Sequence, residues 1–305
     1  MQQIFAVGDV GALTEGQVRL YERFWQLHAS KEDLLVLLGD NLYPAGYRGT
    51  LRDKKRWERV VRMTRVFPGR VCATPGNHDW KAGEQGLLHQ ATFIPHYPSV
   101  GLVGPETLFW NSWRLIFVDS ELYMRQTQKH YSVWEKVDSL GKVESLATIF
   151  VLHHPPLTAG VHGGNYPLIL HIFPLLSFRS CLYLPLPGVG SMISWLRKKA
   201  KHPTDKFHPV YAALAESLLT RAKKWSGSVL FLSGHDHNLQ FHWLGEKKGV
   251  IVSGSGCRWA PVARKKAFWA RAVVGLWKIS NTSVEAYALK RPQKPIWKYQ
   301  FFVVP

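Results

Sequence analysis

The chain has 305 residues, of which 46% are hydrophobic and 13% aromatic, a composition that excludes an intrinsically disordered protein. The length suits one large domain or two ordinary ones, and we expect a single domain over residues 1–305. Lys and Arg number 39 against 21 Asp and Glu, so the net charge of +18 favours anionic partners such as phosphorylated small molecules, nucleic acid or an acidic membrane face. The basic residues form short scattered runs typical of a solvated surface, which makes nucleic-acid binding unlikely.

Three cysteines stand at wide spacing, namely Cys72, Cys181 and Cys257. Their odd number argues against a disulfide framework and against a thiolate zinc site. The chain starts Met1-Gln2-Gln3 and enters an apolar run at once, without the pattern of a signal peptide. The expectation for location is therefore cytoplasmic by default, and exported or membrane-associated if the true N-terminus lies further upstream.

The first third of the chain alternates strand-like and helix-like segments. Continuous apolar runs predict strands at 4–7, 34–38 and 70–74. Apolar residues with a period near 3.6 predict helices at 14–27, with Thr14 as the N-cap, and at 51–66. Continuous apolar strands separated by helices indicate a sheet covered on both faces, as in an α/β protein.

The remainder continues this pattern and then changes it. A hairpin turning at Asn111-Ser112 is predicted within 107–118. The strands predicted after residue 239 are joined by short connections, and they are therefore expected to pair antiparallel. The further predicted elements are helices at 126–140 and 209–225 and strands at 147–152, 229–232, 240–244, 250–253, 273–279, 283–288 and 296–303.

Residues 165–208, which we call the cap, interrupt the pattern. Residues 166–196 are strongly apolar, yet prolines divide them, whereas a membrane-spanning helix needs ~20 uninterrupted apolar residues. We expect an insertion folded onto the body beside the strand ends. The alternative is a peripheral membrane contact through 166–201, where the basic residues 197–201 would meet anionic lipid.

Polar residues that could bind metal follow the apolar runs directly. Each motif alone could be structural, but together they predict side chains gathered at one edge of a sheet. Carboxylate, amide and imidazole ligands without thiolates suit Zn, Fe or Mn. The residues are Asp9, Asp40, Asn77, His153, His235 and His237.

Five short motifs in this order resemble the signature blocks of the calcineurin-like metallophosphoesterases, over residues 4 to about 239. The resemblance implies a four-layer αββα fold in which two β-sheets form a sandwich flanked by helices. It also implies hydrolysis of phosphoric esters at a dinuclear metal centre. The motifs are Gly8-Asp9, Gly39-Asp40-Asn41, Gly76-Asn77-His78-Asp79, His153-His154-Pro155 and Gly234-His235-Asp236-His237.

One departure from the common pattern points to a branch of this superfamily. Many members have a histidine two residues after the first aspartate, where this chain has Gly11. Tyr43 instead matches the tyrosine ligand of the purple acid phosphatases. His162, nine residues after His153, matches a histidine that those enzymes keep beside the metals. The stretch 171–191 is similar to an insert in bacterial members, some of which are exported or membrane-linked.

The resemblance implies a ligand for every position of two metal sites. One metal would be held by Asp9, Asp40, Tyr43 and His237. The other would be held by Asp40, Asn77, His153 and His235, so that Asp40 bridges the two.

The metals and the neighbouring groups follow from the same resemblance. A phenolate at Tyr43 favours Fe³⁺, paired with Fe²⁺, Zn²⁺ or Mn²⁺, although Tyr43 could also be a core tyrosine. His78 is expected to donate a proton or stabilise the transition state, with Asp79 orienting its ring, and His162 to share that role. His154 is either a substrate contact or packed.

The predicted function is hydrolysis of a phosphorylated small molecule, most simply a phosphomonoester, by a metal-bridging hydroxide. A phosphodiesterase or nucleotide pyrophosphohydrolase is the alternative within the same chemistry. From another class, the chain could be a membrane-docking or scaffold protein that retains a metal site.

Overall fold

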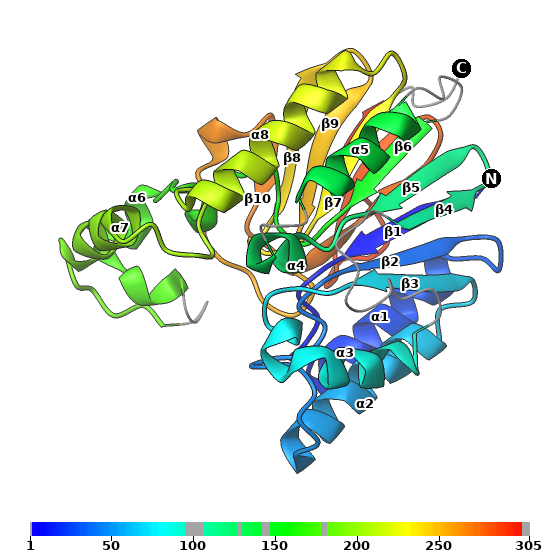
Figure 1. Ribbon diagram of the computed structural model, residues 1–305. Coiled ribbons are helices and arrows are strands. Elements are labelled where there is room, and N and C mark those ends of the chain that lie inside the picture. Colours follow the sequence, from blue (N-terminus) through cyan, green and yellow to red (C-terminus); the bar gives the residue numbers. More distant parts are fainter. Residues whose placement is uncertain (1, 95–105, 127–129, 142–146, 178–181, 301–305) are drawn as a thin grey trace.

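The computed structural model describes residues 2–94, 106–126, 130–141, 147–177 and 182–300. Two β-sheets lie face to face, and helices cover the outer face of each (Figure 1). The predicted fold class, a two-sheet sandwich flanked by helices, is thereby confirmed.

The first sheet has six strands in the order β13-β12-β11-β1-β2-β3. Its β1, β2 and β3 are parallel, and β11, β12 and β13 continue from β1 in antiparallel pairing, as expected for the short C-terminal connections. These strands are β1 (Ile4–Val7), β2 (Leu34–Leu38), β3 (Arg70–Thr74), β11 (Gly275–Ile279), β12 (Ser283–Ala288) and β13 (Trp297–Gln300).

The second sheet has seven strands in the order β10-β8-β9-β7-β6-β5-β4. Here β5, β6, β7 and β9 are parallel neighbours, whereas β8 pairs antiparallel with β9. The short β10 was not predicted from the sequence. The strands are β4 (Glu106–Trp110), β5 (Trp113–Phe117), β6 (Ala147–Val151), β7 (Val229–Ser233), β8 (Leu239–Gly245), β9 (Lys248–Ser253) and β10 (Trp269–Arg271).

Helices form the two outer layers (Figure 1). The first sheet is covered by α1 (Glu15–His28) and α2 (Leu51–Arg65), and Thr14 caps α1 as predicted, in a reciprocal capping box with Gln17. The second sheet is covered by α4 (Ser120–Arg125), α5 (His130–Gly141) and α8 (Pro209–Lys224). Residues 127–129 of the predicted helix 126–140 lie outside the described residues, and α3 (Gly83–Ala91) was not predicted.

Alternating side chains of each strand explain the layers. On β1, Ile4 and Ala6 point into the core between the sheets, whereas Phe5 and Val7 pack against α1 and α2. On β6, Ile149 lies in the inter-sheet core and Phe150 under α8. Both faces of the strands are therefore apolar, and this produces the continuous apolar runs in the sequence.

The cap stands apart from both sheets, near the start of α8 (Figure 1). It contains α6 (Leu168–Ile172), a 3₁₀ turn at Pro174–Ser177 and α7 (Val189–Lys199). The helices cross closely at Gly190, where a Cβ would lie 1.9 Å from the Leu170 carbonyl oxygen. Further 3₁₀ turns occur at Asp79–Ala82, Val161–Gly163 and Arg264–Lys266. Across the described residues, the search for a helix long and apolar enough to cross a bilayer found none.

Candidate metal centre

The carboxyl ends of strands from both sheets bring the predicted ligand residues together. Asp9 follows β1, Asp40 and Tyr43 follow β2, and Asn77 follows β3, all from the first sheet. The second sheet contributes His153 after β6, and His235 and His237 after β7. All of these residues are buried.

The backbone bends sharply where these strands end. Asp9, Asp40 and His235 have φ angles of 60°, 52° and 70°, in the left-handed region that residues other than glycine rarely adopt. Gly39 has φ 86°, and a Cβ there would lie 2.5 Å from His153 Nδ1. Such backbone strain is concentrated at functional sites, where the surrounding structure holds it in place.

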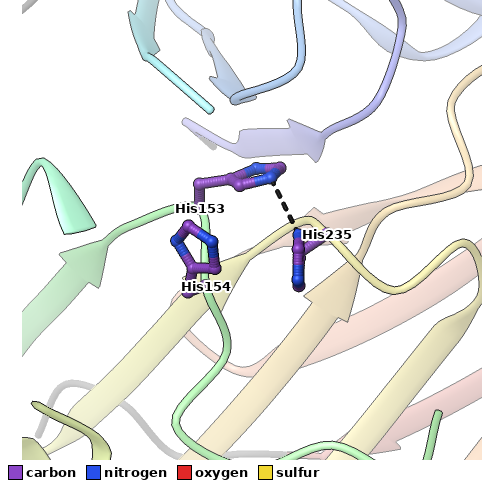
Figure 2. Close-up of side chains that lie close together, drawn as sticks. All are labelled: His153, His154 and His235. Atoms are coloured by element: carbon purple, nitrogen blue, oxygen red, sulfur yellow. Dashed lines mark hydrogen bonds between the residues drawn. The ribbon is translucent and has the colours of Figure 1, made fainter. Parts of the chain in front are cut away.

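The best-defined donor group surrounds His153 Nε2. This atom lies 3.1 Å from Asn77 Oδ1, 3.2 Å from His235 Nδ1 and 3.5 Å from Asp40 Oδ1. Figure 2 shows the His153 and His235 rings in contact, with His154 beside them. These separations are those of adjacent ligands on one ion with metal–ligand bonds of about 2.0–2.2 Å.

Carbonyl oxygens fix which ring nitrogen of each histidine carries the proton. His153 Nδ1 donates to Leu38 O at 2.8 Å, His235 Nε2 to Thr204 O at 2.8 Å and His237 Nδ1 to Gly254 O at 2.9 Å. Because a carbonyl can only accept, the nitrogen that faces it carries a proton, and the lone pair of a neutral ring then lies on the other nitrogen. Burial also lowers the pKa of His235 and His237 well below the ordinary value, which favours the neutral, ligating form.

The second donor group surrounds Asp9. Its Oδ1 accepts a hydrogen bond from the Tyr43 hydroxyl at 2.6 Å, and one oxygen each of Asp9 and Asp40 and one nitrogen of His153 lie within 4.8 Å of one another. Burial, with the Asp40 and Asp9 carboxylates adding to it, raises the pKa of Tyr43 well above its ordinary value. Tyr43 is therefore a phenol that donates to Asp9.

His237 lies beside Asp9, with its Nδ1 3.4 Å from Asp9 Oδ1. Its Nε2 accepts from Arg258 Nη2 at 2.6 Å, and the Arg258 guanidinium carbon lies 5.0 Å from the centroid of the Tyr43 ring. Arg258 was not predicted as a site residue, although it closely follows the Ser253-Gly254-Ser255-Gly256 loop. It adds a cation beside the oxygen donors of the first sheet.

A cavity of about 290 Å³ opens above the donor groups. His78, with a side chain 25% exposed, reaches it and places Nε2 3.9 Å from Asp40 Oδ2. The cap closes one side through Ile193, Arg197 and Thr204. The lining also includes Asp40, Asn77, His162, His235, His237 and Arg258.

Asp79 does not orient the His78 ring, contrary to the expectation from the sequence. Its carboxylate accepts from the backbone N–H groups of Gly76, Asn41 and Leu42 at 2.9, 3.0 and 2.9 Å, while His78 Nδ1 faces the Pro44 carbonyl. The buried carboxylate satisfies three backbone donors of two loops, an arrangement that the sequence motif alone did not reveal. Burial and the nearby Asp40 raise the pKa of Asp79 to about 7.

His162 and His154 have different surroundings. His162 lines the cavity, and its Nδ1 lies 2.9 Å from Asp205 Oδ1, a carboxylate that Arg197 also binds. His154 is 1% exposed, and its Nδ1 lies 2.9 Å from the Ser120 hydroxyl. Of the two readings for His154, the geometry favours a packed side chain beneath the site.

A family model described as calcineurin-like phosphoesterase matches residues 3–239. The chain belongs to the calcineurin-like phosphoesterase family. A search of the curated proteins found no match.

Solved structures share the fold at low sequence identity. The structure described as "GAP50 the anchor in the inner membrane complex of Plasmodium" has a TM-score of 0.64 and 16% identity, covering 100% of this chain and 89% of that one. The purple acid phosphatase PPD1 from yellow lupin (Lupinus luteus) seeds has a TM-score of 0.58 and 12% identity, covering 98% of this chain and 53% of that one. This calcineurin-like phosphoesterase therefore spans about half the length of the plant enzyme.

The donor groups of this family member fit a metal centre of the dinuclear kind typical of the family. Two aspartates, an amide oxygen and imidazoles converge from both sheets, and contacts with backbone carbonyls orient the imidazole rings. Oxygen and nitrogen donors of this kind suit zinc, manganese and iron. Asp205 and Arg197, which the sequence did not reveal, belong to the surroundings of this site.

Proposed function

We propose that this calcineurin-like phosphoesterase is a dinuclear metal-dependent hydrolase of phosphoric monoesters. One ion would be held by Asp9, Asp40, Tyr43 and His237. The other would be held by Asp40, Asn77, His153 and His235. The observation that carries this proposal is the convergence of donors from both sheets on Asp40 and His153, beneath a cavity that His78 and Arg258 also line.

The side chains around the cavity suit a phosphate ester. Two ions, when bound, supply a nucleophilic hydroxide at neutral pH and neutralise the phosphoryl oxygens. His78 faces the cavity from beside Asp40 and is positioned to protonate a leaving oxygen, while Arg258 offers a cation to the phosphoryl group. His162, steadied by Asp205, is the second candidate for that proton transfer.

The tyrosine ligand of the purple acid phosphatases is the finer part of the proposal. A Cβ at Gly11 would lie 2.5 Å from the Tyr43 backbone nitrogen, which itself donates to the Gly11 carbonyl at 3.1 Å. The loops after β1 and β2 thus leave no room for a side chain at position 11. This supports a coupled replacement of a histidine ligand by Tyr43, and with it an Fe³⁺ ion paired with Fe²⁺, Zn²⁺ or Mn²⁺.

Metal content and hydrolysis of p-nitrophenyl phosphate test the proposal together. We expect purified protein to carry about two ions. Because Asp40 would contact both ions, the variant Asp40→Asn should bind less metal, and its kcat should fall at least a thousandfold. Asp138→Asn, at an exposed carboxylate paired with Arg221, is the control and should retain both. Full activity of Asp40→Asn would reject the mechanism.

A phosphodiesterase or nucleotide pyrophosphohydrolase is the alternative with the same chemistry, favoured by the net charge of +18. A panel of monoesters, diesters and nucleotides, compared by kcat/KM, separates the two. A higher kcat/KM for diesters would replace the monoester assignment.

The second candidate class is a membrane-docking scaffold that keeps the metal site. The fold similarity to the structure described as an anchor, and the apolar surface of the cap, favour it. Metal-dependent turnover that Asp40→Asn abolishes would reject a purely structural role.

A further inference from the structure

The cap carries an unusual number of exposed apolar side chains. More than half of the exposed large apolar side chains of the described residues belong to it. They lie on α6, on α7 and on the segment between them. These residues are Leu168, Ile169, Ile172, Leu182, Tyr183, Leu184, Met192, Trp195 and Leu196.

The helix α7 presents two different faces. Ile193 and Arg197, four residues apart, line the cavity of the metal centre. Met192, Trp195 and Leu196 recur at helical spacing on another face and are 54%, 58% and 48% exposed. The outward residues therefore make no contribution to the cavity.

The cap segment itself is strongly basic. Asp205 is the single acidic residue of the sequence between 165 and 208, and it is buried and paired with Arg197. Lys198, Lys199 and Lys201 are exposed at the end of α7. Lys199 Nζ lies 4.9 Å from the centroid of the Trp195 ring, so a cation lies directly beside one of the exposed apolar side chains.

We propose that the cap docks on an anionic lipid bilayer through the exposed α7 residues Met192, Trp195 and Leu196 and the other exposed apolar side chains of the cap. Trp, Leu and Met side chains would enter the interface between headgroups and acyl chains, and the lysines would contact lipid phosphates. Exposed apolar residues followed by exposed lysines, in a segment whose single acidic residue is buried, match this partner in both polarity and charge. Because these residues lie outside the cavity, the proposal holds whether or not the metal centre hydrolyses an ester.

Flotation with lipid vesicles tests the docking. The full-length protein should float with vesicles of phosphatidylcholine and phosphatidylglycerol and much less with phosphatidylcholine alone. The triple variant Met192→Ser, Trp195→Ser, Leu196→Ser should bind at least tenfold less lipid. Lys198→Glu with Lys199→Glu should remove the preference for anionic vesicles, and added salt should weaken wild-type binding.

A matched triple variant controls for the loss of exposed apolar groups in general. Leu51→Ser, Leu88→Ser and Phe109→Ser change side chains that are 77%, 56% and 62% exposed on the body of the protein. This control should float as well as wild type, and circular dichroism should show that all variants remain folded.

Three results would overturn the proposal. The first is a wild-type protein that stays in solution beside anionic vesicles. The second is equal lipid binding by both triple variants. The third is a wild-type dimer that becomes monomeric in the cap variant without any lipid binding, which would assign these side chains to contact with a second copy of the chain. Metal content and phosphatase activity are measured separately from flotation, so failure of the docking is distinguishable from failure of the proposed hydrolysis.

Discussion

The two sheets contribute different chemistry to the candidate metal centre. The first sheet supplies Asp9, Asp40, Tyr43 and Asn77, which are oxygen donors. The second sheet supplies imidazoles, held in their ligating tautomers by backbone carbonyls. Buried carboxylates need a cation nearby, whereas buried neutral imidazoles do not. The oxygen half is thus the one expected to need a bound cation, whereas carbonyl contacts already orient the rings of the imidazole half.

The loops that carry the two donor groups approach each other closely at two glycine residues. At Gly39, on the first sheet, a side chain would collide with His153 on the second. Gly234, on the second sheet, lies equally close, since a Cβ there would be 2.6 Å from the Leu38 carbonyl oxygen. The distance between the donor halves is therefore set by residues that are not themselves ligands.

Gly39→Ala should have the largest effect on the centre, because the new Cβ must push His153 away from its partners. We expect loss of metal binding and about 1–3 kcal/mol of stability from the left-handed backbone alone. Metal analysis and urea unfolding measure the two. Gly49→Ala is the control, since Gly49 has φ 80° but no atom within 4 Å of the new Cβ. Equal metal loss in both variants would contradict the role of the sheet contact.

Asp205→Asn tests whether a carboxylate of the cap positions His162 beside the imidazoles of the second sheet. The change removes the charge that His162 and Arg197 share, and we expect a decrease of about 10–100-fold in kcat with unchanged metal content. Steady-state kinetics with parallel metal analysis measure this. Asp138→Asn again serves as the control. A loss of metal instead of turnover would place Asp205 among the determinants of metal binding.

Tyr43→Phe probes the oxygen half with a smaller expected effect on turnover. If Tyr43 binds Fe³⁺, the wild-type protein has a visible charge-transfer band that the phenylalanine variant lacks. Absorption spectra of the protein loaded with iron record the outcome. A wild-type protein that is colourless and fully active with zinc or manganese would reject the iron assignment and leave the fold unaffected.

Glu285→Gln should leave metal binding and turnover unchanged, because Glu285 lies on β12 and does not line the cavity. Burial alone would raise its pKa, but Lys278 and Lys298 at 2.8 and 2.7 Å lower it to about 2. Since the pKa is lower in the folded state, the stabilisation is complete above pH 4.5 and is lost as the pH falls toward 2. We expect a cost of about 1–3 kcal/mol at neutral pH, measured by urea unfolding, which shrinks in acid. A constant difference at all pH values would contradict this.

The sequence alone indicated every described strand except β10, the polar residues that follow the strands, and the family. These signals are local, because a buried strand requires a continuous apolar run and the turn that follows requires glycine or a small polar residue. The ligand residues therefore stand directly after apolar runs, where a single sequence reveals them. The predicted roles of these residues in metal binding remain predictions.

Only the tertiary structure decided the relations between distant segments. Asp79 pairs with backbone N–H groups of two loops, Arg258 contacts His237 from 21 positions away, and Asp205 of the cap reaches His162. No periodicity or motif marks such pairs, since each depends on how two sheets and a cap pack. For the same reason the sequence left open whether the apolar residues of 165–208 are buried, and the structure shows many of them facing outward.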